Sequence, residues 1–289
     1  MFEKVLVATD LSPASDCLLQ CLGELKTVGT SEAVLAHVIY VTNTPGFEEA
    51  FAADSSPMLA QQKSKLEEQG FQVITEMKLG IPAFTLHDLA EQHSVDAILI
   101  GSRGRGIVQQ AVLGSVAFKL LQVTRKPVLL ARVSLLAEGE SCRFAICQRL
   151  FEHILFPTDF SETAEHAFTH LERMTAALKG PVTLLHVQDR SYAEIHLSGH
   201  EAEKQLTITR ERLDTLKARL ERLGARVETE VVEGVPREEI LQRAASGQYS
   251  LIAMGTQGKG FFREALLGSL AHEVARRAEL PVLFFPCRS

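Results

Sequence analysis

Short apolar runs alternate with amphipathic stretches along the whole chain. In the first half the apolar runs cover residues 5–8, 33–39, 73–77, 97–100 and 128–130. Several of them are nearly continuous in Val, Ile and Leu, which is typical of parallel strands covered on both faces. We therefore predict a strand at each of these five positions.

Helical patterns lie between these runs. The expected helices begin at Pro13 and Pro82 and cover residues 57–68, 115–123 and about 199–223. The two prolines suit a first helical turn, where a missing N–H costs little. Because strands and helices alternate, we predict an α/β fold in which right-handed crossovers build an open parallel sheet.

The second half of the sequence repeats the first. Thr9-Asp10 returns as Thr158-Asp159, 149 positions later, and Gly114-Ser115 returns as Gly268-Ser269, 154 positions later. A single length difference of five residues explains the two offsets, so the chain is a tandem duplication. A chain of 289 residues also exceeds what one core usually organises. We assign residues 1–133 and 151–289 to two domains and residues 134–150 to a linker.

Composition narrows the class of protein. Apolar residues make up 46% of the chain and charged residues 23%, which argues against long disorder and against a disulfide scaffold. No apolar run approaches the roughly 18 residues that cross a bilayer, and the N-terminus lacks a secretory signal. Five cysteines without zinc-finger spacing favour free thiols in a reducing, cytoplasmic setting. The net charge of −6 argues against a nucleic-acid partner.

Glycines follow the fourth strand of each half with the same spacing. The motif is Gly-x-x-Gly-x9-Gly-Ser, at residues 101–115 and again at 255–269. Open α/β sheets bind ligands beyond the carboxyl ends of their strands. Glycine lets backbone N–H groups approach a ligand, and a helix that begins at the serine attracts an anion. Two identical copies favour phosphate binding, although the glycines could be turns and the serines plain helix caps.

This motif resembles the universal stress protein family, in particular tandem members of its ATP-binding branch. The resemblance rests on the glycine spacing, on an Asp that ends the first strand, and on a closing Pro-Val-Leu strand. It implies two Rossmann-like domains of the adenine nucleotide alpha hydrolase type, each with five parallel strands flanked by helices. It further implies an adenine nucleotide at the carboxyl edge and a pseudo-dimer of the two domains through their last strands. Whether two chains form a homodimer stays open.

Matching positions carry the family's binding residues onto this sequence. For ATP, ADP or AMP the resemblance implies contacts from Thr9, Asp10, Val38, Gly101, Arg103, Gly104, Gly114, Ser115 and Val116 in the first half, and from Thr158, Asp159, Val187, Gly255, Gly258, Gly268, Ser269 and Leu270 in the second. The Asp residues should face the nucleoside, because a carboxylate repels phosphates. Helix capping or an Asx-turn is the alternative role for them. A bound triphosphate would bring Mg²⁺.

The two copies differ in the glycine loop. Arg103 in the first copy corresponds to Gln257 in the second, and arginine can hold phosphate in a bidentate manner. The two sites could therefore differ in affinity or in the preferred number of phosphates.

Two further classes of function compete with a nucleotide-binding regulator of the stress response. One is a slow ATP hydrolase, against which stands the absence of the sequence Gly-x4-Gly-Lys-[Ser/Thr] and of an evident general base. The other is a dimerisation scaffold with empty pockets, and the intact glycines count against it. We expect no catalytic residues and no protein metal site.

Histidines offer weaker candidates. The pairs His166/His170 and His196/His200 have a helical spacing that could seat a metal ion, but two ligands are few, and solvent-exposed helix positions are the more economical interpretation. His37 and His186 lie in apolar strands and should be buried and hydrogen-bonded.

Overall fold

The computed structural model describes residues 2–40, 48–102, 113–132, 149–175, 177–178, 180–189, 199–258 and 267–287. The described residues up to Arg132 belong to one compact unit, and those from Arg149 to Cys287 belong to a second. Of the residues expected at the site, Arg103 and Gly104 lie outside the described residues, as does nearly all of the expected linker.

The first unit contains a five-stranded parallel sheet, which confirms the predicted fold class. Its strands are β1 (Lys4–Thr9), β2 (Glu32–Ile39), β3 (Gln72–Leu79), β4 (Ala97–Gly101) and β5 (Val128–Ala131). They are ordered β3-β2-β1-β4-β5, and all described pairings are parallel. Each of the five apolar runs in the sequence became a strand.

The second unit repeats this sheet. Its strands are β6 (Ile154–Pro157), β7 (Val182–Asp189), β8 (Val227–Gly234), β9 (Leu251–Gly255) and β10 (Val282–Phe285). They are ordered β8-β7-β6-β9-β10, again with parallel pairings. Most apolar side chains of the central strands in both sheets are buried, as are Val5, Leu6 and Val7 of β1.

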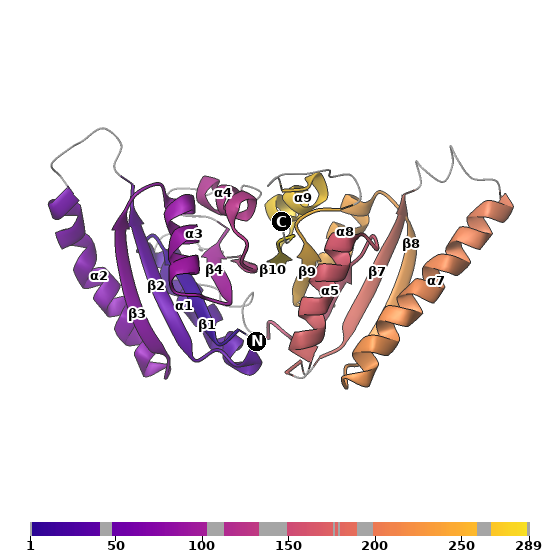
Figure 1. The fold of residues 1–289 in the computed structure, drawn as a ribbon, viewed down its shortest axis with the longest axis horizontal. Helices are drawn as coiled ribbons and strands as arrows, with labels where there is room; N and C mark the ends of the chain where they lie inside the picture. The colour runs from indigo at the N-terminus through magenta and orange to yellow at the C-terminus, as the bar shows by residue number, and fades with distance from the viewer. Residues whose placement is uncertain are drawn as a thin grey trace. The chain divides into compact units, whose positions relative to one another are not determined.

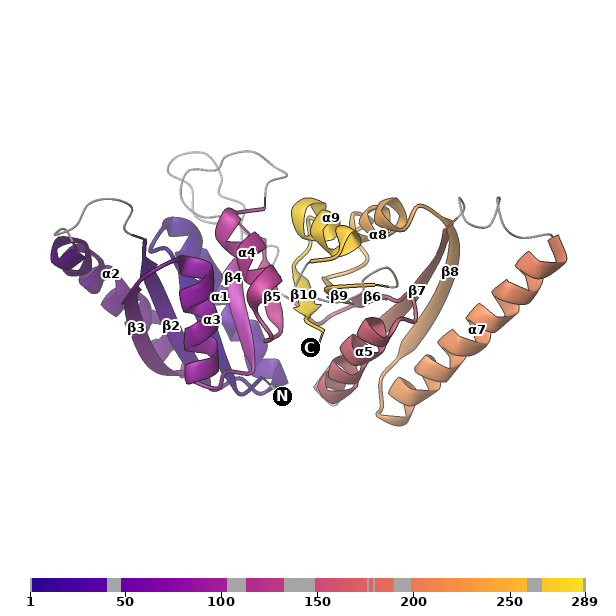
Figure 2. The same cartoon turned by 45° about the horizontal axis from the view of Figure 1, so that its top comes forward.

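Helices cover both faces of each sheet (Figures 1 and 2). The first unit has α1 (Pro13–Leu25), α2 (Glu48–Glu68), α3 (Pro82–Gln92) and α4 (Ser115–Val123), and the second has α5 (Glu162–Thr175), α7 (Gly199–Arg222), α8 (Pro236–Ala244) and α9 (Ser269–Arg277). Helix α1 contacts α2, and α3 contacts α4, with the matching pairs α5 and α7 and α8 and α9 in the second unit. Because the strand order reverses after the third strand, right-handed crossovers place the two helix pairs on opposite faces.

One helix boundary differs from the sequence prediction. Helix α2 was expected to begin at Pro57, but it begins nine residues earlier, at Glu48, and runs through the proline. The preceding residues 48–53 are Glu, Glu, Ala, Phe, Ala and Ala, of which the glutamates and alanines are strong helix formers. Their propensity outweighs the lost N–H of a single proline.

Two expectations about side chains are wrong. Cys17 and Cys21, one turn apart on α1, are each disulfide-bonded rather than thiols. His166 and His170 on α5 are half-buried rather than solvent-exposed, and the His170 ring stacks on Phe285 with 4.9 Å between ring centroids. His196 lies outside the described residues, and His200 is exposed as expected.

None of the described helices is both long enough and apolar enough to span a bilayer.

Candidate functional site

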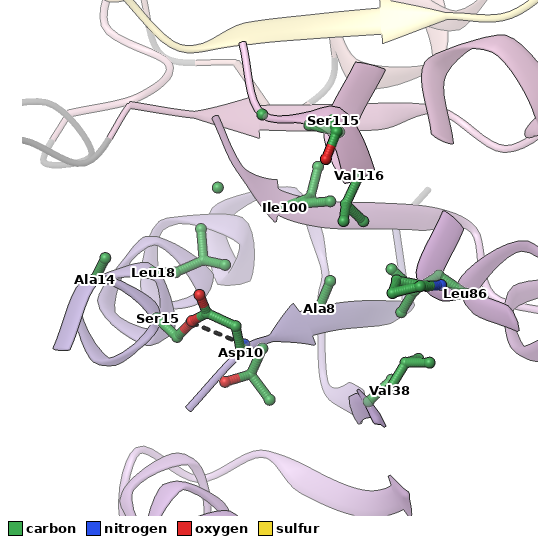
Figure 3. Close-up of a pocket in the computed structure, with 16 residues that line it drawn as sticks. Ala8, Asp10, Ala14, Ser15, Leu18, Val38, Leu86, Ile100, Ser115 and Val116 are labelled. Carbon is green, nitrogen blue, oxygen red and sulfur yellow. Dashed lines mark hydrogen bonds between the residues drawn. The ribbon is translucent and has the colours of Figure 1, made fainter. Parts of the chain in front are cut away.

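A cavity opens at the carboxyl ends of β1, β2 and β4, where the strand order of the first sheet reverses. Its volume is about 250 Å³. Parallel α/β sheets bind ligands at this kind of switch point because crossovers leave it in opposite directions. The described residues that line it are Ala8, Thr9, Asp10, Ala14, Ser15, Leu18, Ala36, Val38, Pro82, Leu86, Ile100, Gly101, Gly114, Ser115, Val116 and Ala117. Figure 3 shows Asp10 and Ser15 on one side of this cavity and Ser115 and Val116 on another.

The second unit has an equivalent cavity of about 460 Å³. It is lined by Pro157, Thr158, Asp159, Ala164, Leu185, Val187, Asp189, Val235, Pro236, Arg237, Ile240, Met254, Gly255, Thr256, Gln257, Gly258, Gly268, Ser269, Leu270, Ala271 and Glu273. Every expected binding residue that the structure describes therefore lines one of the two cavities.

A tight turn fixes Asp10 at the end of β1. One carboxylate oxygen, Oδ1, accepts hydrogen bonds from the Ser12 N–H at 3.1 Å and the Ser12 hydroxyl at 2.5 Å, and a further one from the Ser15 hydroxyl (Figure 3). Ser12 in turn caps α1 by accepting from the Ser15 N–H at 3.3 Å. The Asx-turn considered as an alternative role for Asp10 is thus present, and it holds the carboxylate in the wall of the cavity.

The second copy builds the same turn around Asp159. Its Oδ1 accepts from the Ser161 N–H at 3.0 Å and from the Ser161 hydroxyl at 2.6 Å. The residue after each Asp, Leu11 or Phe160, has φ of 59°, a left-handed conformation that is uncommon outside glycine. Strained backbone that recurs at the same place in both copies is typical of a functional turn.

The threonines and histidines beside these Asp residues support the turn. The Thr9 hydroxyl accepts from the Leu11 N–H at 3.0 Å and donates to Gln62, and both threonines are buried. His37 and His186 place Nδ1 at 2.9 and 2.7 Å from the carbonyl oxygens of Thr9 and Thr158. The prediction of a buried, hydrogen-bonded histidine is confirmed for His186, whereas His37 is hydrogen-bonded but only half-buried. The threonines line the cavities while their hydroxyls hold the loop.

The glycine before each serine is the N-cap of the following helix. Gly114 and Gly268 have extended backbones, with φ of −62° and −60°, and no side chain caps α4 or α9. The first intrahelical bonds run from Phe118 to Gly114 and from His272 to Gly268. The serines are therefore the first helical residues rather than caps, and the N–H groups of the first turn have no intrahelical acceptor.

Close packing explains glycine at two positions of the second loop. A Cβ on Gly258 would lie 2.8 Å from Oδ2 of Asp159, and a Cβ on Gly268 would lie 3.1 Å from the Thr256 carbonyl oxygen. Gly258 therefore brings the loop backbone close to the Asp159 carboxylate, and Gly268 brings the start of α9 close to the backbone of Thr256 and Gln257.

Backbone groups of Val187 face the second cavity. The Thr158 N–H donates to the Leu185 carbonyl at 2.8 Å, so the polar groups of Leu185 face the β6 side. Backbone groups of alternate residues point to the same side of a strand. The register of β6 with β7 ends at Pro157 and Leu185, so the N–H and C=O of Val187 project past the end of β6. The β1–β2 register likewise ends at Thr9 and His37, one residue before Val38.

The cavities differ in charge. Of the described residues that line the first cavity, Asp10 alone is charged. The second cavity is lined by four charged residues, Asp159, Asp189, Arg237 and Glu273. A hydrogen bond from Arg276 lowers the pKa of Glu273, and the charge of Arg277 lowers it further, against a smaller opposing effect of burial. Glu273 is therefore ionised at neutral pH.

Several lining residues were not expected from the sequence. Ser15 and Leu18 come from α1, Pro82 and Leu86 from α3, and Ile100 from β4. The repeat contained a signal for one of them, because Gly80-Ile81-Pro82 matches Gly234-Val235-Pro236, and Pro236 lines the second cavity.

Comparisons with known proteins identify the family. The model of the Universal stress protein family matches residues 1–132 and again residues 150–286. A universal stress protein of Methanocaldococcus jannaschii is 34% identical over 152 residues, covering 46% of this chain and 94% of its own, and one of Mycolicibacterium smegmatis is 26% identical over 96% of this chain and 95% of its own. The crystal structure of a universal stress protein from Archaeoglobus fulgidus superposes with a TM-score of 0.76 at 23% identity, covering 99% of both chains. Since the family model matches both halves, this chain belongs to the universal stress protein family as a tandem member.

Proposed function

We propose that this protein binds an adenine nucleotide in one or both cavities and acts as a regulatory protein of the stress response. One observation carries the proposal. In each unit a carboxylate held by a turn and the uncapped N-terminus of a helix lie in the wall of a single cavity. A nucleotide has the matching polarity, with hydroxyls on its sugar and negative charge on its phosphates.

The phosphates belong at the helix N-terminus. The N–H groups of the first turn of α4 or α9 and the positive end of the helix dipole attract an anion. Each dipole contact is worth about 0.3–1 kcal/mol when exposed, so several N–H groups must converge. Glycine at the N-cap leaves room for the phosphate to approach them.

The sugar belongs beside Asp10 or Asp159, because a carboxylate accepts hydrogen bonds from hydroxyls and repels phosphate. The base then reaches the end of β2 or β7. There Val38 or Val187 presents a backbone donor and acceptor side by side, which complement N1 and the 6-amino group of adenine.

The proposal does not require a protein metal site. Among the residues that the structure describes, no group of three or more His, Cys, Asp and Glu side chains could hold a metal ion. A Mg²⁺ ion that accompanies a triphosphate would be held mainly by phosphate oxygens and water.

Mass spectrometry of the purified and then denatured protein tests the proposal. We expect ATP, ADP or AMP to co-purify, and added ATP to raise the melting temperature. Gly114→Val and Gly268→Val together should abolish that rise by filling the two N-caps. An unchanged ATP-dependent rise in the double variant would refute the proposal, and ADP that accumulates over hours would instead indicate hydrolysis.

A further inference from the structure

The duplication allows the two cavities to be compared position by position. Asp189, Arg237 and Glu273 line the second cavity. Their counterparts in the first copy are Tyr40, Ala83 and Lys119, and none of these is among the described residues that line the first cavity. The second cavity thus carries polar groups on the side of β7, α8 and α9 that its duplicate lacks.

Asp189 is placed next to the backbone groups assigned to the base. It is the last residue of β7 and pairs in register with Gly234. Leu185, Val187 and Asp189 alternate along the strand, and all three line the cavity. At about 3.3 Å per residue, Asp189 lies roughly 6.6 Å beyond Val187 toward the end of the strand.

The strand direction orients a base in this cavity. Along the chain the N–H of Val187 comes before its C=O. A purine that accepts at N1 from this N–H and donates to this C=O from its 6-amino group therefore turns its 6-position toward Asp189. A carboxylate there attracts an amino group, which donates, and repels an oxo group, whose oxygen is electron-rich.

We infer that Asp189 makes the second cavity select 6-aminopurine nucleotides over 6-oxopurine nucleotides more strictly than the first cavity does. This inference rests on the proposed function. In the first copy Tyr40 occupies the corresponding position and is 59% exposed, so discrimination there depends on the Val38 backbone. Asp189 thus determines which base is bound and takes no part in a chemical step.

Arg237 works in the opposite direction. Its guanidinium would attract an oxo group. Its side chain is 55% exposed and lies 3.7 Å from Glu238. Both Asp189 and Arg237 are exposed, so solvent screens both charges, but the carboxylate of Glu238 beside Arg237 also offsets the charge of Arg237. We therefore expect the contribution of Asp189 to prevail. The Arg237→Ala variant measures how much Arg237 lowers the preference for ATP over inosine triphosphate.

The test compares ATP with inosine triphosphate, which carries an oxo group in place of the 6-amino group. Gly114→Val leaves only the second cavity open, and Gly268→Val leaves only the first. By calorimetry or equilibrium dialysis, we expect the ratio of ATP affinity to inosine triphosphate affinity to be about tenfold higher in the second cavity, the value of one hydrogen bond to a charged group.

Exchange of residues between the copies supplies matched controls. In the Gly114→Val chain, Asp189→Asn and Asp189→Tyr should each lower the ratio about tenfold. In the Gly268→Val chain, Tyr40→Asp should raise it. Should a blocking variant fail to fold, Asp189→Asn and Tyr40→Asp in the otherwise unchanged chain move the overall ratio in opposite directions.

The possible outcomes distinguish failure of this inference from failure of the proposed nucleotide binding on which it rests. If neither nucleotide binds any chain, the proposed function fails. If ATP binds both cavities with equal ratios, if Asp189→Asn leaves the ratio within twofold, or if inosine triphosphate is preferred, the inference alone is overturned.

Discussion

At the scale of single residues, Asp10 combines a structural role with a position in the cavity wall. Its Oδ1 is engaged with Ser12 and Ser15, so the side chain organises the turn before any ligand arrives. In the second copy Ser161 makes the same two bonds to Asp159 that Ser12 makes to Asp10, whereas Ala164 stands in place of Ser15 and has no hydroxyl to donate. A structural role in the turn and a position in the cavity wall are therefore compatible in one carboxylate.

Removal of the Asp10 carboxylate should destabilise the first unit. We expect Asp10→Ala to lower the free energy of unfolding by about 1–2 kcal/mol, because the Ser12 N–H loses its acceptor and the turn its anchor. Asp10→Asn should cost less, since an amide oxygen still accepts. Calorimetric melting checks this, with the exposed Asp54→Ala on α2 as the control. Equal melting temperatures for Asp10→Ala and the unchanged protein would contradict the structural role.

At the scale of elements, a glycine inside α1 and a glycine after α7 show that replacement of glycine can have opposite effects on stability. Gly23 lies inside α1, and a Cβ there would meet only Gln69 at 3.6 Å within 4 Å. Gly224, after α7, also has open space around a Cβ, but its φ is +90°. Space is available at both positions, and only the backbone conformation distinguishes them.

We therefore expect opposite results from two alanine substitutions. Gly23→Ala should raise the free energy of unfolding by about 0.5–1 kcal/mol, because alanine loses less entropy in a helix. Gly224→Ala should lower it by a similar amount, because alanine is strained in the left-handed region. Denaturant titrations of both variants give the comparison, and a shift of the same sign in both would show that conformation does not decide the effect.

Strand β3 and the end of α3 are joined by a charged cluster. Glu76 lies 2.8 Å from His93 and 3.2 Å from Lys78, and its side chain is 16% exposed. Burial raises the pKa of Glu76, but the hydrogen bonds and charges of His93 and Lys78 outweigh it, so the pKa is lowered below its ordinary value of 4.5.

A lowered pKa in the folded state gives a stabilisation that is present above the ordinary value and is lost as the pH falls through the folded value. Glu76→Gln should therefore lower the melting temperature more at pH 7 than at pH 3. Melting curves at both pH values test this against the exposed Glu68→Gln on α2. An equal effect of Glu76→Gln at the two pH values would exclude the pKa as its cause.

At the scale of the whole molecule, duplication supplies two cavities in one chain. Each is built at the switch point of its own sheet, from residues of its own unit. The described linings differ mainly in charge, because Asp189 at the end of β7, Arg237 on α8 and Glu273 on α9 line only the second cavity. The two copies therefore share the same fold but differ in the residues that line their cavities.

We expect two nucleotides per chain. In native mass spectrometry, the unchanged protein should carry two at saturation, Gly114→Val and Gly268→Val one each, and the double variant none. A saturated, unchanged protein with a single nucleotide would show that only one of the two cavities is competent. The single variant that loses it then identifies the unit.

The sequence alone determined the architecture of each half, because the relevant signals are local or repeated. Buried parallel strands require continuous apolar runs, prolines mark two helix starts, and a fixed offset reveals the duplication. The glycine motif also identified most of the described loop residues that line the cavities. Helix α2 was the exception, since the propensity of residues 48–56 competes with Pro57 and only the folded chain resolves that competition.

Tertiary structure decided what depends on neighbours far apart in sequence. Ser15, Leu86 and Ile100 line the first cavity because three elements meet there, and no local pattern predicts that meeting. The bonds of Asp10, the glycine N-caps and the projection of Val187 past β6 likewise follow from packing and register. The sequence determines which side chains are available, whereas the crossover connections at the switch point determine which of them face one another.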